Sequence, residues 1–413
     1  MSRKSILILT ASHLCQNPRV VKEATALGAA GYDVTVLNVA TIPDFVLPDE
    51  ELARRRPFRR VVLDYTRRDW VTRLRHFHRR AHTWGSRAAL RWLRLESADT
   101  LGPAHALLAR ARGCPADLTI AHTEIPLWAA RRLSAGGRRV AVDFEDWYSE
   151  DLLADDRRTR PLRLLRAAEA HVLQHAAYVS VTSASMADAL AQSQPGSRPV
   201  VIRNVFPLPP AFRRAQPADS SPPAFVWFSQ TIGPGRGLEE FFSAWSLTKH
   251  PSRVCLIGRE RPEFVAGLLS ALPAEKRTHV SVVPLIPPDE LPAKLAEFDL
   301  GLALEPQWPR NKDVTISNKV FQYLAAGLAL VASDTAGQRE VLAAAPASGV
   351  IVDRDDAPRF AAQLDELLSN PGRLRGCQQA ARAAAENEFC WEKETPRLLA
   401  AVERALASPP PAA

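Results

Sequence analysis

Short apolar runs alternate with helix-forming stretches along this chain, and the alternation occurs twice. The first run, residues 5–9 (Ser-Ile-Leu-Ile-Leu), suits a strand buried on both faces, as in a parallel sheet. A loop follows it, then a helix over about 19–30 that ends at Gly31, then a second strand over 32–39. This order predicts a βαβ unit, the start of a doubly wound sheet.

The same order of elements continues on both sides of a proline-rich segment. Residues 207–223 combine prolines with small polar residues, which cannot sustain a helix, and therefore predict a linker. A chain of 413 residues is long enough for two domains. We expect an α/β protein of two Rossmann-like doubly wound domains that face a central cleft. The predicted parts are an N-terminal domain over 1–206, a C-terminal domain over 224–390, and a helix with a disordered tail over 391–413.

Cysteine content and hydropathy indicate the compartment. The five cysteines are an odd number, lie far apart and include no C-x-x-C pair, so we expect reduced thiols and neither a disulfide framework nor a zinc site. The N-terminal apolar run is too short for a signal peptide, and no run reaches the roughly 18 residues of a spanning helix. The sequence predicts a cytoplasmic protein.

Positive charge is concentrated between Arg54 and Arg94, within a predicted helical insertion over about 50–100. The chain carries +8, and this stretch has fourteen arginines against two aspartates, a local charge of +12, so the rest carries −4. Aromatic residues are interleaved with the arginines: Trp70, Phe77, Trp84 and Trp92. Peripheral contact with the inner face of an anionic membrane, or with a lipid-linked acceptor, is one interpretation. A pair of solvated helices is another, and nucleic-acid binding is the least favoured.

Two motifs in the C-terminal half are typical of a phosphate site. Residues 228–239 (Phe-Ser-Gln-Thr-Ile-Gly-Pro-Gly-Arg-Gly-Leu-Glu) read as a strand end, a glycine-rich loop and a helix start, an arrangement that points backbone N–H groups at an anion. Residues 317–327 (Ser-Asn-Lys-Val-Phe-Gln-Tyr-Leu-Ala-Ala-Gly) read as a second helix start. The alternatives are plain turn glycines in the first motif and a packed amphipathic helix in the second.

In the order and spacing of these motifs the chain resembles the retaining glycosyltransferases of the GT-B fold, the group of glycogen and sucrose synthases and of bacterial envelope and capsule sugar transferases. The family motif Gly-Arg-x(5)-Lys-Gly has Gln230 at its Arg and Arg236 at its Lys. The family's ribose-binding Glu is Gln322, and its sugar-contacting Glu falls on Val314, beside Asp313. The resemblance implies these donor-binding residues: Ser229, Gln230, Gly233, Gly235, Ser317, Asn318, Gln322 and Glu340. It implies these catalytic residues: Arg236, Lys319, Asp313, Glu145 and Asp146.

The N-terminal half supplies the acceptor side in this resemblance. Residues 143–150 (Asp-Phe-Glu-Asp-Trp-Tyr-Ser-Glu) are similar to the family's D-x-H-E-x-x-x-E stretch, with Glu145 at the His and Asp146 at the Glu. The predicted acceptor-side residues are His13, Asn17, Arg19, His122, Asp143 and Glu150. There are alternatives to these roles. The segment 143–150 could be a surface loop, His122 could be structural, and Asn17 could simply begin a helix.

The resemblance implies transfer of a sugar from a nucleotide-sugar to a hydroxyl group with retention of configuration. It also implies that no metal is bound. No other cofactor is expected, because the nucleotide-sugar is a substrate. Charge on the leaving diphosphate would be stabilised by cations and helix N-termini. Since Gln230, Gln322 and Val314 lack the family's charges, a non-catalytic binder of nucleotide-sugar or of a partner protein is one alternative. An epimerase or phosphorylase on the same fold is the other.

Overall fold

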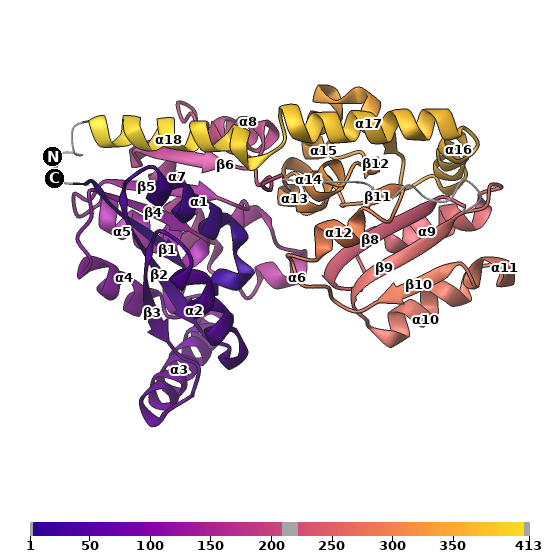
Figure 1. The fold of residues 1–413 in the computed structure, drawn as a ribbon. Helices are drawn as coiled ribbons and strands as arrows, with labels where there is room; N and C mark the ends of the chain where they lie inside the picture. The colour runs from indigo at the N-terminus through magenta and orange to yellow at the C-terminus, as the bar shows by residue number, and fades with distance from the viewer. Residues whose placement is uncertain (1–2, 209–221, 409–413) are drawn as a thin grey trace. The chain divides into compact units, whose positions relative to one another are not determined.

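The structure, a computed structural model, describes residues 3–208 and 222–408, so most of the predicted linker and the end of the predicted tail lie outside the described residues. It divides into two compact units (Figure 1). Unit 1 is Met1–Ile202 with Thr395–Ala413, and unit 2 is Arg203–Glu394. The boundary between the units therefore follows residue 202 of the chain, whereas the predicted boundary followed residue 206. The chain returns to unit 1 at Thr395.

Unit 1 is built on a seven-stranded parallel sheet of order β3-β2-β1-β4-β5-β6-β7. Its strands are β1 (Ser5–Thr10), β2 (Asp33–Ala40), β3 (Arg59–Asp64), β4 (Leu118–His122), β5 (Val140–Phe144), β6 (Tyr178–Val181) and β7 (Val200–Val201). The α-helices within it are α1 (Pro18–Ala29), α2 (Val46–Arg54), α3 (Trp70–Leu93), α4 (Ala104–Arg112), α5 (Glu124–Ser134), α6 (Ala154–Arg157), α7 (Leu162–His175) and α8 (Ala184–Ser193). Short 3-10 helices are η1 (Leu14–Gln16), η2 (Pro43–Phe45), η3 (Ala98–Thr100) and η4 (Tyr148–Glu150).

Unit 2 is built on a six-stranded parallel sheet of order β10-β9-β8-β11-β12-β13. Its strands are β8 (Ala224–Thr231), β9 (Arg253–Arg259), β10 (Val280–Val283), β11 (Leu300–Ala303), β12 (Ala329–Ser333) and β13 (Gly349–Val352). Its helices are α9 (Leu238–Leu247), α10 (Pro262–Ser270), α11 (Ala274–Arg277), α12 (Leu291–Leu295), α13 (Arg310–Val314), α14 (Asn318–Ala325), α15 (Ala336–Ala344), η5 (Pro346–Ser348), α16 (Ala357–Leu368) and α17 (Pro371–Asn387), and α18 (Trp391–Ala407) runs on into unit 1.

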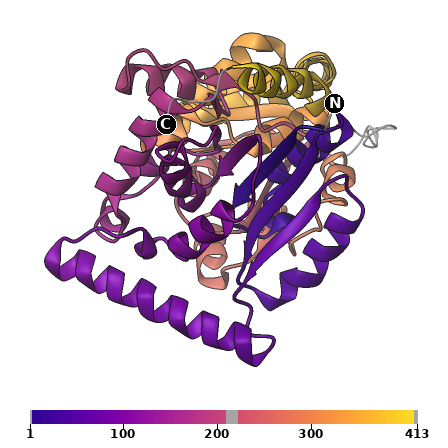
Figure 2. The ribbon, with the colours of Figure 1, turned by 90° about the vertical axis from the view of Figure 1, so that its left-hand side faces the viewer.

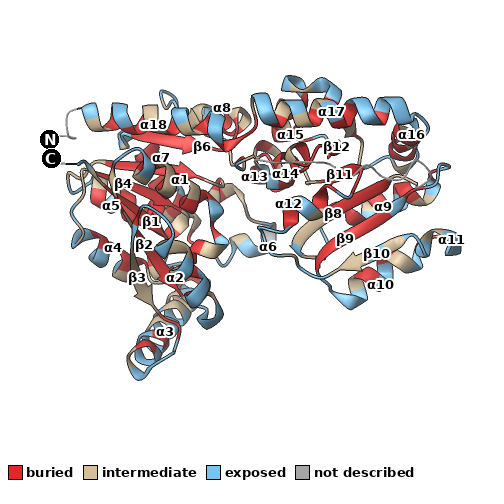
Figure 3. Cartoon of the chain, in the orientation of Figure 1, coloured by how far each residue is buried: buried red, intermediate tan, exposed pale blue. Residues whose placement is uncertain are grey.

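The central strands of both sheets are buried on both faces, as their continuous apolar runs predict (Figure 3). In unit 2, Phe225 of β8 packs on Phe241 of α9, whereas Phe228 packs on Tyr323 of α14. Because neighbouring residues of a strand point to opposite faces, α9 and α14 cover opposite faces of this sheet. Gly301 of β11 is required here, since a Cβ atom would lie 2.2 Å from the Tyr323 ring.

The prediction of two doubly wound α/β domains is confirmed, and one part of it is wrong. Residues 59–64 lie inside the segment predicted as a helical insertion, yet they form strand β3 and pair with β2. Their apolar centre, Val61 to Leu63, fits a half-buried edge strand. The surrounding arginines concealed this strand from the sequence pattern, and the helical part of the segment consists of the end of α2 and all of α3.

Each sheet has a point at which its strand order reverses. In unit 1 this point lies between β1 and β4, and in unit 2 it lies between β8 and β11. In open α/β sheets the crevice beside the carboxyl ends of such strands is where ligands bind. The fold therefore directs attention to the loops after β1, β4, β8 and β11.

Candidate functional site

In unit 2 a buried ion pair lies at the carboxyl end of β11. Lys319, in the first turn of α14, places its Nζ 2.6 Å from Glu305 Oε1 and 5.6 Å from the centre of the Trp227 ring. Ser317 Oγ donates to the same carboxylate oxygen over 3.1 Å. Burial alone would raise the pKa of Glu305, but the Lys319 ammonium and these hydrogen bonds lower it to about 2. Lys319 is thus held by a counter-ion.

The glycine-rich loop after β8 brings a second cation to this edge. Gly237 has a φ of +79°, and a Cβ atom on it would lie 2.4 Å from the carbonyl oxygen of Leu304, so only glycine fits. The preceding residue, Arg236, is exposed, and its Nη1 donates to Ser229 Oγ over 2.7 Å. The contacts of Lys319 and Arg236 are thus both with side chains in the second half of β8, Trp227 and Ser229.

Gln322 carries an unused hydrogen-bond acceptor beside this pair of cations. It lies on α14, one turn beyond Lys319, and is half-buried. Among the described residues no group donates to its buried Oε1. Buried polar atoms nearly always have a partner, so an unpaired acceptor at a sheet's ligand-binding edge is a candidate for contact with a ligand hydroxyl.

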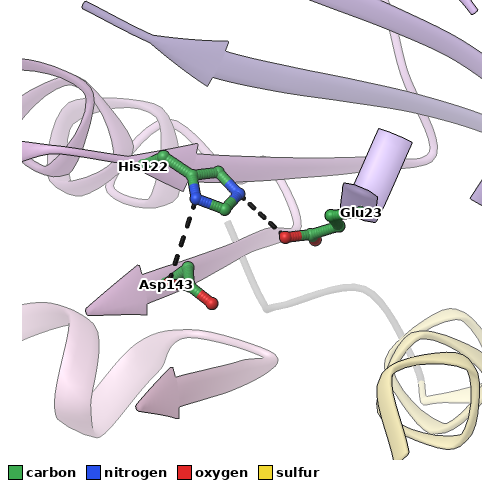
Figure 4. A group of neighbouring side chains, drawn as sticks. All are labelled: Glu23, His122 and Asp143. Carbon is green, nitrogen blue, oxygen red and sulfur yellow. Dashed lines mark ion pairs between the residues drawn. The ribbon is translucent and has the colours of Figure 1, made fainter. Parts of the chain in front are cut away.

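In unit 1 the predicted acceptor-side residues meet in a buried charge network. Arg19 donates to both oxygens of Asp143, from Nε over 2.8 Å and from Nη2 over 2.6 Å. Ser180 Oγ also donates to Asp143, over 2.6 Å. His122 lies with Nε2 2.9 Å from Glu23 Oε2 and Nδ1 3.9 Å from Asp143 Oδ1 (Figure 4). The Arg19 guanidinium keeps the pKa of Asp143 below its ordinary value against the effect of burial.

The network continues to Glu145, the member with most contact with solvent. His122 Nδ1 is 3.0 Å from Glu145 Oε1, and Asn17 Nδ2 donates to that oxygen over 2.9 Å. Asn17 also caps α1, because its Oδ1 accepts from the backbone N–H of Val20. Burial alone would lower the pKa of His122, but the charge of Glu23 and the hydrogen bonds to both glutamates raise it to about 10. The imidazolium therefore fixes the direction of the Glu145 side chain.

The group of Glu23, His122 and Asp143 fits this charge network better than a metal site. Their candidate ligand atoms all lie within 4.8 Å of one another. However, both oxygens of Asp143 already accept from the Arg19 guanidinium, whose charge would repel a divalent cation there. His122 would also have to lose a proton that its pKa of about 10 retains at neutral pH.

A cavity of about 380 Å³ opens at the strand ends of unit 1. Ser12 after β1, Thr123 and Glu124 after β4, and Asp146 after β5 contribute to its walls. It therefore occupies the position at which the order of this sheet reverses, where a ligand is expected. Tyr148 also lines it, and its hydroxyl oxygen accepts from the backbone N–H of Thr123 over 3.0 Å.

Part of unit 2 is similar to a known protein family. Residues 222–370 match the family Glycosyl transferases group 1. Spore coat protein SA of Bacillus subtilis (strain 168) is 24% identical over 136 residues, which are 33% of this chain and 35% of that protein. The chain thus spans about a third of the length of the curated relative that it matches. These findings support a glycosyltransferase, as the motifs predict.

Solved structures extend the similarity to both units. Sucrose-phosphate synthase from Thermosynechococcus elongatus has a TM-score of 0.72 at 16% identity, with 98% of this chain and 100% of that chain covered. Anabaena HepE in complex with UDP-glucose has a TM-score of 0.67 at 14% identity, with 97% and 100% covered. A Rickettsia africae glycosyltransferase has a TM-score of 0.69 at 13% identity, with 99% and 100% covered. At these identities the likeness concerns the fold, which is GT-B.

Several of the predicted site residues have partners elsewhere in their unit. His13 lies with Nδ1 2.9 Å from Asp49 Oδ2, and its Nε2 accepts from two backbone N–H groups, so it supports the loop after β2 and does not face an acceptor. Glu150 pairs with Arg157 and Arg166 at the surface. Arg19, His122 and Asp143 are brought together but are almost fully buried, which replaces their predicted acceptor contact with a role in positioning Asn17 and Glu145.

Two predicted residues of unit 2 are also engaged. Asp313 Oδ1 accepts from the backbone N–H of Ala336, at the start of α15, over 2.9 Å, and its contact with the donor sugar stays a prediction. Glu340 lies 3.5 Å from Arg203. Ser317 occupies the N-cap position of α14, but its side chain bonds Glu305 and makes no cap hydrogen bond. Of the other predicted donor residues, Ser229 and Gln230 lie at the end of β8, Gly233 and Gly235 lie on the loop after it, and Asn318 begins α14.

Sequence reasoning missed three residues that complete these arrangements. Glu305 follows β11 without a recognisable motif, and Glu23 lies on the inner side of α1, where an acidic residue looks like ordinary helix surface. Lys22 lies next to Glu23; burial and the charge of Arg19 lower its pKa to about 7. A signal existed only for Glu305, which is the first carboxylate after a buried strand.

The arginine-rich helix α3 carries its aromatic residues on the outside. Its buried residues are Thr72, His76 and Leu90, whereas Trp70, Leu74, Phe77, Trp84 and Trp92 are 64–76% exposed. At 100° per residue these five fall within an arc of about 80° and form one line along the helix, and exposed Leu93, at its end, lies outside that arc. We call this line the α3 stripe: Trp70, Leu74, Phe77, Trp84 and Trp92. Figure 2 shows α3 as a long helix at the margin of unit 1.

Proposed function

We propose that the protein transfers a sugar from a nucleotide-sugar to a hydroxyl of an acceptor, with retention of anomeric configuration, in the synthesis of a surface polysaccharide, glycolipid or related glycoconjugate. The observation that carries this is the convergence of Arg236 and Lys319 on β8, at the reversal point of the sheet that lies in the family-matched region. Cations at such an edge stabilise a diphosphate.

The donor's parts divide among the unit 2 residues. The exposed guanidinium of Arg236 binds the diphosphate, and the backbone N–H groups at the start of α14 add their dipole. Lys319, fixed by Glu305, supplies a second hydrogen-bond donor at the same edge. The unpaired Gln322 Oε1 accepts from a ribose hydroxyl, a neutral counterpart of the carboxylate that the family uses there.

The reaction requires no nucleophile from the protein. The bond from the anomeric carbon to the diphosphate oxygen breaks, and a bond from that carbon to the acceptor hydroxyl oxygen forms on the same face. The hydroxyl proton passes to an oxygen of the leaving diphosphate. Glu145, held by Asn17 and the buried network, and Asp146 in the strand-end cavity orient the acceptor hydroxyl.

A nucleotide screen tests the donor site. UDP is the first candidate, because the HepE structures that resemble this fold contain UDP or UDP-glucose. Binding to the native state raises the melting temperature by mass action. We expect stabilisation by one nucleoside diphosphate and at least tenfold weaker affinity in Arg236→Ala, with Arg359→Ala, an exposed arginine elsewhere in unit 2, as the control. No stabilisation by any nucleoside diphosphate would contradict the proposal.

Product analysis separates transfer from its alternatives. Incubation with nucleotide-sugar and acceptor should release nucleoside diphosphate only when the acceptor is present. Conversion of the nucleotide-sugar alone would indicate an epimerase, and phosphate-dependent turnover a phosphorylase. Nucleotide binding with no turnover on any acceptor would indicate the non-catalytic binder.

We further propose that the protein works in the cytoplasm, at the inner face of a membrane that holds a lipid-linked acceptor. The α3 stripe lies beside arginines such as Arg73, Arg80 and Arg91, so apolar insertion and attraction to anionic headgroups act on one side of the helix. Of the helices among residues 3–208 and 222–408, none combines the length and apolar character that crossing a membrane requires.

Vesicle flotation tests this contact. Deleting 54–94 would remove strand β3 from the sheet, so substitutions are the better design. We expect binding to vesicles that contain anionic phospholipid, weaker binding to neutral vesicles, and loss in a Trp70→Ala/Phe77→Ala variant. Leu247→Ala, which removes an exposed apolar residue on α9, is the control. Equal flotation of both variants would contradict docking through the stripe.

A further inference from the structure

A second cavity, of about 700 Å³, lies beside the C-terminal half of α3. One wall is formed by four residues of that helix: Trp84, Arg87, Arg91 and Trp92. The opposite wall comes from the segment after β5 and includes Leu152 and Arg160. The second half of the α3 stripe thus borders this cavity, which we call the hollow, whereas its first half does not.

The two cavities of unit 1 share part of their walls. Leu152 and Arg160 line both the hollow beside α3 and the 380 Å³ cavity at the strand ends. The shared residues connect the exposed aromatic stripe with the loops after β1, β4 and β5, which bear the residues proposed to orient an acceptor.

The chemistry of the hollow is both apolar and cationic. Trp84, Trp92 and Leu152 offer apolar surface, and Arg87, Arg91 and Arg160 offer three guanidinium groups. The acidic groups facing them are Asp156, which lines the hollow, and Glu124, which pairs with Arg160. The balance is positive, and Arg91 already lies with its guanidinium 5.5 Å from the Trp92 ring centre, so cation and apolar surface are presented together.

We infer that this hollow binds the acceptor as a lipid phosphate: its apolar chain lies against Trp84 and Trp92, its phosphate is bound by Arg87 and Arg91, and its hydroxyl-bearing group extends past Arg160 into the strand-end cavity. This rests on the proposed function and adds to it the class of the acceptor. An exposed arginine beside a phosphate forms charge-assisted hydrogen bonds, and a tryptophan face accommodates a hydrocarbon chain.

Calorimetric titration of the full chain with decyl phosphate, below its micelle concentration, tests the site. Decanol and inorganic phosphate are the two partial probes. We expect decyl phosphate to bind at least tenfold more tightly than either, because only it uses both kinds of wall. Equal affinity for decanol would overturn the role of the arginines, and equal affinity for inorganic phosphate would overturn the role of the tryptophans.

Matched variants locate the site on the helix. Trp84→Ala and Arg91→Gln should each weaken decyl phosphate binding at least tenfold. Trp70→Ala and Arg80→Gln remove the same kinds of exposed side chain from α3 outside the hollow and should change it less than twofold. Equal losses in both pairs would mean that the probe adheres along the stripe, which would overturn the assignment.

A parallel titration with the stabilising nucleoside diphosphate separates this proposal from the one on which it rests. We expect Trp84→Ala and Arg91→Gln to bind the nucleotide as the wild type does. Decyl phosphate binding without any nucleotide binding would overturn the transferase function and keep the lipid-phosphate site. Nucleotide binding without decyl phosphate binding would do the reverse.

Discussion

The two units place charged residues at equivalent positions of similar sheets, but the exposure of these residues to solvent differs between the units. In unit 1, Arg19, His122 and Asp143 are at most 2% exposed and are paired with one another and their neighbours. In unit 2, Arg236 is exposed and bonds only a serine hydroxyl among the contacts described, while Lys319 is held by Glu305. Charge that is neutralised internally maintains a shape, whereas charge that remains accessible is available to a ligand.

This difference assigns distinct roles to the two sets of residues. The network of unit 1 contacts solvent chiefly through Glu145, so its buried members act on a substrate by fixing that side chain. The site of unit 2 acts through Arg236 directly. Substitutions in unit 1 should therefore alter stability first, and substitutions in unit 2 should alter ligand affinity first.

The largest expected effect is on stability, in unit 1. Arg19→Met removes one partner of a fully buried pair and leaves Asp143 uncompensated, which should cost about 3–5 kcal/mol of unfolding free energy. Denaturant unfolding measures it. The control, Arg166→Met, breaks an exposed pair with Glu150 and should cost under about 1 kcal/mol. Equal costs would erase the distinction between buried and exposed charge in this unit.

The second effect is a pH dependence that originates in the same network. The pKa of His122 is raised to about 10, so its stabilising charge is fully present below its ordinary pKa of 6.5 and is lost as pH rises through 10. Lys22, with its pKa lowered to about 7, contributes with the opposite sign, because folding then favours its neutral form.

The measurable quantity is consequently a difference between two proteins. Between pH 6.5 and 10 the unfolding free energy of the wild type should fall relative to that of His122→Asn. Urea titrations at a series of pH values would give both curves. Parallel curves would mean that His122 is neutral in the folded protein.

A smaller effect is expected for the ion pair of unit 2. Lys319→Met leaves the buried Glu305 carboxylate without its cation, which should cost about 1–3 kcal/mol. The double variant Lys319→Met/Glu305→Gln removes the stranded charge and should recover most of that loss. If the double variant binds the nucleoside diphosphate as the wild type does, Lys319 has no part in the donor site.

The smallest expected change in stability is that of Arg236→Ala. This side chain is exposed, so its loss should alter the unfolding free energy by less than about 0.5 kcal/mol. The tenfold loss of nucleotide affinity expected for it would then occur in a fully folded protein. A large loss of stability would mean that Arg236, like Arg19, has a structural role.

Sequence alone predicted the fold well because strand burial and helix periodicity are local signals. The strands predicted over 5–9 and 32–39 are β1 and β2, each within one residue of its predicted ends. Strand β3 was missed because arginines flank its apolar centre, and only pairing with β2 reveals it. The site was predicted less completely. Motifs located Arg236, Lys319 and Glu145, but spacing cannot tell which carboxylate reaches which cation, as Glu305 and Asp313 illustrate.

Unit 1 is discontinuous, and this has a consequence for how the protein is made. Leu398, Ala401, Val402 and Ala405 of α18 are at most 2% exposed, and Arg139 of the same unit donates to the carbonyl oxygen of Ser408. When residues 1–202 have left the ribosome, the α18 residues that pack into this unit have therefore not yet been synthesised. Its final assembly must wait until unit 2 has been translated, so truncation within α18 should damage the half of the protein that is synthesised first.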